Sequence, residues 1–176
     1  MRAIKHLILG GARSGKSRYA EGVCSALHQQ HPETELIYIA TATADDSEMA
    51  KRIEQHQRRR GSEWQLRECA VELGTALSAC HDQSIVLIDC LTLWLSNCLH
   101  RDCWPHQRAA LLNAVHAFEG TVIMVSNEVG GGIVPLGQLS REFVDQSGWL
   151  HQSLAAQCSE VSLVVAGLPL SLKQPI

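Results

Sequence analysis

Two glycines, a lysine and a serine near the start of the sequence have the types and spacing that hold phosphate. The stretch GGARSGKS covers residues 10–17 and matches the pattern G-x-x-x-x-G-K-[ST]. Glycines let the backbone fold around an anion with its N–H groups pointing inward, and a following helix adds its positive N-terminus. Lys16 supplies a charge for the outer phosphates, and the Ser17 hydroxyl can ligate Mg²⁺. The pattern predicts a phosphate-binding loop.

An acidic residue is expected at the end of a buried strand to complete such a site. Asp89 closes the apolar run SIVLID and suits the role of holding the metal or its water. Aspartate is also a favoured helix cap, so capping of a helix over residues 91–99 is the alternative interpretation.

A histidine in a predicted helix over residues 45–60 is a candidate nucleophile. Met49, Ile53 and His56 share one face of that helix, and Arg52 and Arg60 lie four residues on either side of His56. A histidine can attack phosphorus, and flanking arginines would stabilise phosphate charge and keep the imidazole neutral. The spacing alone equally fits a packed or solvated side chain.

Three glycines follow another buried strand. In VSNEVGGGIVP, residues 125–135, the strand ends at Asn127 and Glu128 and leads into Gly130, Gly131 and Gly132. Open α/β sheets bind ligands beyond the carboxyl ends of their strands, and glycines permit close approach of the backbone. The alternative is an ordinary surface loop.

Short β-rich runs alternate with helical patterns along the whole chain. This alternation predicts a P-loop NTPase-like α/β fold, a mostly parallel β-sheet with helices on both faces. Strands are predicted over residues 4–9, 35–40, 64–68, 84–89, 121–126 and 161–166. Helices are predicted over residues 18–28, 45–60, 71–80, 91–99, 107–118 and 140–158, and the tail from residue 169 is expected to be peripheral.

Composition narrows the class of protein. The 176 residues predict a single nucleotide-binding domain over 1–176. With a net charge of −3, the chain is not expected to have a positively charged surface that binds nucleic acid. No apolar run is long enough to cross a bilayer. Seven scattered cysteines favour reduced thiols in the cytoplasm. The cluster CLHRDCWPH, residues 98–106, fits no standard zinc spacing and is interpreted as a helix end and loop.

Several segments together resemble one enzyme family, the bifunctional adenosylcobinamide kinase/adenosylcobinamide-phosphate guanylyltransferase of cobalamin biosynthesis. The matching stretches are GGARSGKS (10–17), YIATATADDSEMAKRIEQH (38–56), LIDCLTLWLSN (87–97) and SNEVGGGIVP (126–135), with a weaker match in SREFVDQSGWLHQSLAA (140–156). The first stretch alone occurs in many unrelated enzymes, whereas the combination is specific.

The resemblance implies two reactions. A nucleoside triphosphate, ATP or GTP, phosphorylates the aminopropanol hydroxyl of adenosylcobinamide; GMP is then transferred from GTP to that phosphate through a guanylylated histidine, which matches His56. The resemblance also implies a homotrimer, with His56 catalytic. The phosphate-loop pattern predicts the catalytic role of Lys16 and the binding of Mg²⁺ by Ser17 and Asp89. The implied nucleotide contacts are Gly10, Gly11, Ala12, Arg13, Ser14, Gly15, Lys16, Ser17, Ala40, Thr41, Ala42, Gln57, Arg58, Arg59, Arg60, Glu68 and Asp89.

This sequence departs from the family pattern at a few positions. The acid at position 89 is often glutamate, so whether Asp89 reads guanine or holds metal stays open. Gln55 stands where some relatives carry a second histidine, Gly61 replaces a frequent proline, and His151 stands where asparagine is common. Two other functions remain: a plain small-molecule kinase in which His56 is incidental, and a non-catalytic GTP-binding switch.

Overall fold

The computed structural model describes residues 3–42, 61–133 and 136–174. The helix expected over residues 45–60 lies outside them. The strands are β1 (Lys5–Gly10), β2 (Glu35–Ala40), β3 (Trp64–Glu68), β4 (Ser84–Asp89), β5 (Thr121–Asn127), β6 (Glu160–Val165) and β7 (Leu168–Lys173). The helices are α1 (Lys16–Gln30), α3 (Leu73–Ser78), α4 (Leu91–His100), α5 (Trp104–Ala117) and α6 (Gln138–Gln157).

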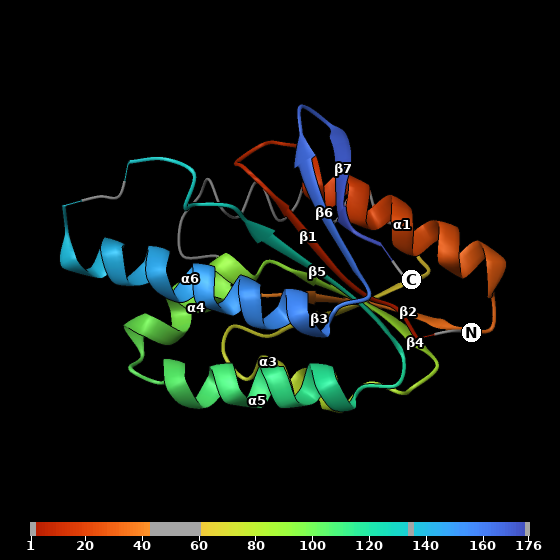
Figure 1. The fold of residues 1–176 in the computed structure, drawn as a ribbon. Coiled ribbons are helices and arrows are strands. Elements are labelled where there is room, and N and C mark those ends of the chain that lie inside the picture. The colour runs from red at the N-terminus through yellow and green to blue at the C-terminus, as the bar shows by residue number, and fades with distance from the viewer. Residues whose placement is uncertain (1–2, 43–60, 134–135, 175–176) are drawn as a thin grey trace.

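The strands form one twisted sheet in the order β3-β2-β4-β5-β1-β6-β7 (Figure 1). All neighbouring strands are parallel except β6 and β7, which pair antiparallel. The central strands are nearly continuous apolar runs, as expected when helices cover both faces of a sheet. The predicted α/β fold with a mostly parallel sheet is confirmed, and the carboxyl ends of β1, β2, β4 and β5 share one edge.

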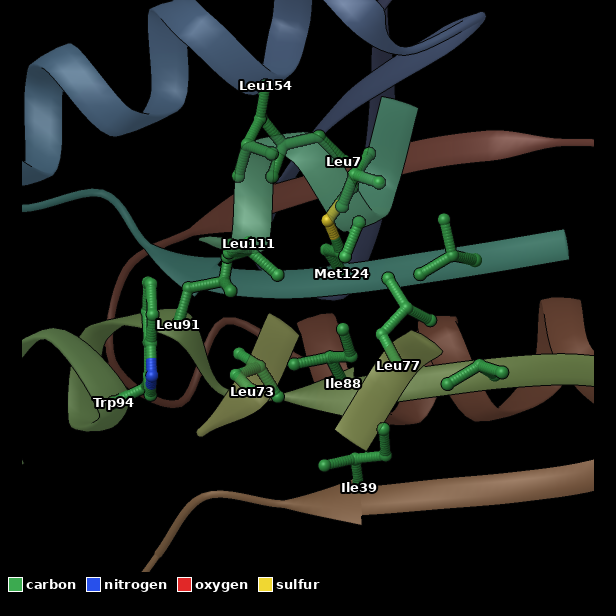
Figure 2. Close-up of a cluster of buried hydrophobic side chains, with 14 of the residues drawn as sticks. Leu7, Ile39, Leu73, Leu77, Ile88, Leu91, Trp94, Leu111, Met124 and Leu154 are labelled. Carbon is green, nitrogen blue, oxygen red and sulfur yellow. The ribbon is translucent and has the colours of Figure 1, made fainter. Parts of the chain in front are cut away.

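Two apolar clusters hold the layers together. On one face, α3, α4, α5 and α6 pack against the sheet, with Trp94, Leu111 and Leu154 among the buried contacts (Figure 2). On the other face, Ala20 and Cys24 of α1 pack against inner strands. Because β1, β4 and β5 are buried on both faces, their carboxyl ends are fixed relative to one another.

The tail differs from the prediction. A strand was not predicted after residue 166, yet β7 forms the outer edge of the sheet beside β6. Pro169 obscured the pattern, because proline is tolerated in a strand only at an edge or a bulge. The expectation that the tail is peripheral holds, since every residue of β7 is exposed.

Helix boundaries also shift by a few residues. α5 begins at Trp104, with Pro105 in its first turn, where the missing N–H costs nothing. Cys98 is buried at the end of α4, and Cys103 caps α5. The interpretation of residues 98–106 as a helix end and loop is therefore confirmed for residues 98–103, whereas residues 104–106 form the first turn of α5.

Candidate functional site

The candidate phosphate-binding loop, residues 10–17, connects β1 directly to α1. Within it, the Ser14 N–H donates to Gly11 O at 3.2 Å, and the Lys16 ammonium donates to Gly11 O at 3.1 Å. Arg13 and Gly15 have positive φ angles of 57° and 93°. Gly15 is the N-cap of α1, so the N–H groups of the first helical turn face the loop. The predicted strand–loop–helix arrangement is present.

Neighbouring backbone explains why two positions in the loop are glycine. A Cβ on Gly10 would lie 2.5 Å from Ser14 Oγ and 2.6 Å from Val164 O. A Cβ on Gly15 would lie 3.2 Å from the Cα of Gly167 in the β6–β7 turn, whose N–H donates to Ser14 O at 2.8 Å. The end of β6 and the turn after it therefore support the loop from outside.

Lys16 and Asp89 form the electrostatic centre of the site. Burial lowers the pKa of Lys16, and the Asp89 carboxylate opposes part of that shift. Asp89 Oδ2 accepts a hydrogen bond from the Tyr38 hydroxyl at 3.0 Å. Asp89 does not cap α4, because the N-cap is Cys90 and no side chain makes a capping hydrogen bond there. The capping interpretation of Asp89 is therefore wrong.

A hydrogen-bonded clamp joins the ends of β2 and β4. The Thr41 hydroxyl donates to Cys90 O at 2.7 Å and accepts from Cys90 N–H at 2.8 Å. The Asn97 side-chain amide, from α4, donates to both Thr41 O and Ala70 O at 3.0 Å. Sequence reasoning selected Thr41 through the family resemblance but did not identify Asn97. Asn97 does belong to the matching stretch LIDCLTLWLSN.

A second set of contacts joins β5 to α4 and to the phosphate-binding loop. The Asn127 side-chain amide donates to Thr92 Oγ1 at 3.2 Å, and Thr92 Oγ1 lies 3.2 Å from Cys90 Sγ. The Glu128 N–H donates to Gly10 O at 3.1 Å. Asn127 and Glu128 are therefore held beside the first glycine of the loop, as expected from the strand end that precedes the glycine run.

His151 of α6 contacts the end of β5. Its Nε2 lies 2.7 Å from Ser126 Oγ, and its side chain is buried. Burial lowers the pKa of His151, while the Glu128 carboxylate opposes that shift. The sequence marked His151 only as a departure from the family pattern, and the structure gives it a packed, hydrogen-bonded position.

Sheet order sets how far the acidic residues lie from the phosphate-binding loop. β5 is next to β1, β4 is second and β3 is fourth. With neighbouring strands about 4.8 Å apart, the backbones of Glu128, Asp89 and Glu68 lie about 5, 10 and 19 Å from the axis of β1. Asp89 and Glu128 share the phosphate end, whereas Glu68, which is exposed, lies at the far edge of the sheet.

The remaining predicted residues divide into two groups. Gly11, Ala12 and Arg13 are exposed at the loop, and Ala40, Thr41 and Ala42 follow one another at the end of β2. His56, Gln57, Arg58, Arg59 and Arg60 lie outside the described residues.

Among the described residues, no group of three or more His, Cys, Asp or Glu side chains is arranged to hold a metal ion. In that same part of the chain, no helix is both long and apolar enough to cross a membrane.

Comparison with known proteins decides the family. The family model described as cobinamide kinase / cobinamide phosphate guanyltransferase matches residues 6–172. The chain belongs to this family. The bifunctional adenosylcobalamin biosynthesis protein CobP of Pseudomonas aeruginosa is 46% identical to it, over 97% of this chain and 98% of that protein. The corresponding protein CobU of Escherichia coli is 36% identical, over 95% and 98% respectively.

A solved structure confirms the fold alone. The flagellar accessory protein FlaH of Methanocaldococcus jannaschii matches with a TM-score of 0.55 at 11% identity, covering 99% of this chain and 80% of that one. The resemblance that the sequence motifs indicated is confirmed by the family match, because that match spans the phosphate-binding loop and every stretch named above.

Proposed function

We propose that this chain carries out the two reactions that name its family: phosphorylation of adenosylcobinamide, and transfer of GMP from GTP to the resulting phosphate. The observation that carries the proposal is the match to the bifunctional family model over residues 6–172. The loop geometry supports it, because residues 10–17 present backbone N–H groups, Lys16 and a helix N-terminus to one anion.

In the first reaction, the acceptor hydroxyl oxygen bonds to the γ-phosphorus, and the bond from that phosphorus to its bridging oxygen breaks. The loop amides, with Arg13 at the exposed rim, orient the triphosphate, and Lys16 neutralises charge on the outer oxygens. Bound nucleotide would replace the carbonyl of Gly11 as the partner of the Lys16 ammonium. Positioning and charge neutralisation are most of what phosphoryl transfer requires of a protein.

We propose Mg²⁺ as the metal ion, with Ser17 and Asp89 as its protein contacts. Hydroxyl and carboxylate oxygens are the donors that Mg²⁺ prefers, and it commonly takes only one or two carboxylates besides phosphate and water. When bound, the ion neutralises charge on the transferring phosphate. The Asp89 carboxylate opposes the lowering of the Lys16 pKa, and this influence on the phosphate-binding lysine supports a metal role for Asp89 over guanine recognition.

In the second reaction, we propose that His56 attacks the α-phosphorus of GTP and releases pyrophosphate. The phosphate of adenosylcobinamide phosphate then attacks the same phosphorus, the P–N bond breaks, and the imidazole is regenerated. We propose Ala40, Thr41, Ala42, Glu68 and residues 57–60 as contacts of the guanosine. The clamp on Thr41 supports this, because it fixes the backbone at the end of β2.

A labelling experiment tests the covalent step. The wild-type chain and His56→Ala are incubated with GTP labelled at its α-phosphate and then denatured. Acid-labile, alkali-stable label is expected on the wild-type chain and not on the variant. Unlabelled wild-type chain would favour a plain small-molecule kinase. GTP hydrolysis with no transfer to adenosylcobinamide would favour a GTP-binding switch.

We further propose that residues 1–176 form a single nucleotide-binding domain that acts in the cytoplasm as a homotrimer. Seven free cysteines among the described residues support a reducing compartment. The exposed apolar side chains of Leu168, Leu170 and Leu172 on the edge strand β7 support burial against another subunit. Sedimentation at several protein concentrations tests the trimer, and a monomer at all of them would contradict it.

A further inference from the structure

Glu128 stands beside the phosphate-binding loop without an assigned role. Its N–H donates to Gly10 O at 3.1 Å, so its backbone is fixed to the first residue of the loop. Among the described acidic residues at the carboxyl edge of the sheet, it follows the strand adjacent to β1. Its side chain is exposed, and Oε1 accepts a hydrogen bond from Gly130 N–H at 2.6 Å.

Three glycines begin two residues after Glu128. A Cβ added to Gly131 or Gly132 would meet no atom within 4 Å, so packing against the described chain does not require glycine at either position. A Cβ on Gly130 would lie 3.0 Å from Glu128 Oε1. A methyl group at position 130 would therefore crowd the Glu128 carboxylate, whereas the described residues leave positions 131 and 132 unobstructed.

The two proposed reactions differ in their need for a base. The first acceptor is an alcohol, which must lose a proton as its oxygen bonds to phosphorus. The second acceptor is a phosphate, which carries about 1.5 to 2 negative charges at pH 7 and has no proton that must be removed. A general base beside the loop therefore serves the kinase reaction only.

We propose that Glu128 is the general base of the kinase reaction, an inference that depends on the proposed function. As the acceptor oxygen bonds to the γ-phosphorus and the nucleoside diphosphate leaves, the hydroxyl proton passes to the Glu128 carboxylate and from there to solvent. Exposure of the side chain permits both the approach of the acceptor and the release of the proton.

The other carboxylates at this edge are less suited to that role. Asp89 accepts a hydrogen bond from Tyr38, opposes the lowering of the Lys16 pKa, and is already proposed as a contact of Mg²⁺. Glu68 lies on the fourth strand from β1, about 19 Å away by strand spacing. Glu128 combines a backbone that is hydrogen-bonded to the loop with an exposed side chain.

The test compares Glu128→Gln with the wild-type chain in separate assays of the two reactions. Glutamine keeps an oxygen that can accept from Gly130 N–H but cannot take a proton. The kinase assay uses adenosylcobinamide and ATP or GTP, and the transfer assay uses adenosylcobinamide phosphate and GTP. Glu142→Gln is the matched control, because Glu142 is exposed on α6. Circular dichroism verifies that each variant is folded.

We expect Glu128→Gln to lower the kinase kcat by about 10²- to 10⁴-fold. The nucleotide KM and the rate of guanylyl transfer should stay within about threefold of wild type, because neither nucleotide binding nor attack by a phosphate needs this base. A kinase kcat within threefold of wild type would overturn the inference. Equal loss of both reactions, or a change confined to KM, would also overturn it, since either indicates a binding or structural role. Absence of both reactions in the wild-type chain would instead overturn the proposed function.

A glycine pair gives a second measurement. Gly130→Ala places a methyl group 3.0 Å from Glu128 Oε1, whereas Gly131→Ala enters open space. We expect the first variant to lower the kinase kcat and the second to leave it closer to the wild-type value. Equal kinase kcat values for the two variants would contradict a role for the position of this carboxylate.

Discussion

Replacing Asn97 with alanine should loosen the carboxyl edge of the sheet. One side-chain amide donates to two backbone carbonyls, Thr41 O and Ala70 O, each at 3.0 Å. Thr41 is fully buried, so water cannot easily replace the lost donor there, whereas Ala70 is partly exposed. Alanine removes both bonds without adding volume.

The two hydrogen bonds determine how much the free energy of unfolding should fall. A typical internal hydrogen bond contributes about 0.5 to 1.5 kcal/mol, so the pair predicts a loss of about 1 to 3 kcal/mol in the free energy of unfolding. For a chain of this size, a loss of about 2 kcal/mol lowers Tm by about 4 to 8 °C. Urea titration followed by circular dichroism measures the free energy directly.

Asn113→Ala is the matched control, because Asn113 is exposed on α5. That variant should stay within about 0.5 kcal/mol of wild type. A double-mutant cycle with Thr41→Val should be non-additive, since the two side chains belong to one clamp. If Asn97→Ala were no less stable than Asn113→Ala, the clamp would not carry the stability assigned to it.

Four further outcomes are expected. Lys16→Ala should abolish both reactions in product assays, and wild-type guanylyl transfer would contradict a shared site. His56→Ala should lose guanylyl transfer and keep the kinase reaction; losing both would indicate a structural role. Gly10→Ala should weaken nucleotide binding by calorimetry, because its Cβ meets Ser14 Oγ at 2.5 Å. Gly22→Ala, at an exposed position of α1, should instead stabilise the fold by up to about 1 kcal/mol. Burial lowers the pKa of His151, so near pH 6.5 this side chain takes up a proton more readily in the unfolded chain than in the folded chain. The free energy of unfolding should therefore fall as the pH drops below about 6.5. His151→Asn should flatten that fall in urea titrations, and an unchanged slope would contradict it.

Local pattern was enough to predict the parts of the site that follow one another in the chain. The loop at residues 10–17 depends on a strand, a glycine pattern and a helix start that are contiguous, and the structure contains all three. Asp89 and Asn127 end strands whose apolar runs are visible without tertiary information. Parallel order then predicts that these ends meet at one edge.

The parts that sequence reasoning missed depend on distant pairing. Asn97 contacts residues 56 and 27 positions away, and nothing near it in sequence indicates those partners. The pairing of β7 with β6 depends on a turn at Ala166 and Gly167, both with positive φ, and alanine gives no signal for that conformation. The contact of Gly167 with Ser14 likewise arises only when the sheet is assembled.

The central claim is that one phosphate-binding loop serves two successive reactions on the same acceptor. Mass spectrometry of the products made from adenosylcobinamide and GTP tests it most directly, with the wild-type chain and Lys16→Ala side by side. We predict adenosylcobinamide phosphate first, then adenosylcobinamide-GDP, and neither product with the variant. Formation of either product by Lys16→Ala at the wild-type rate would contradict the claim.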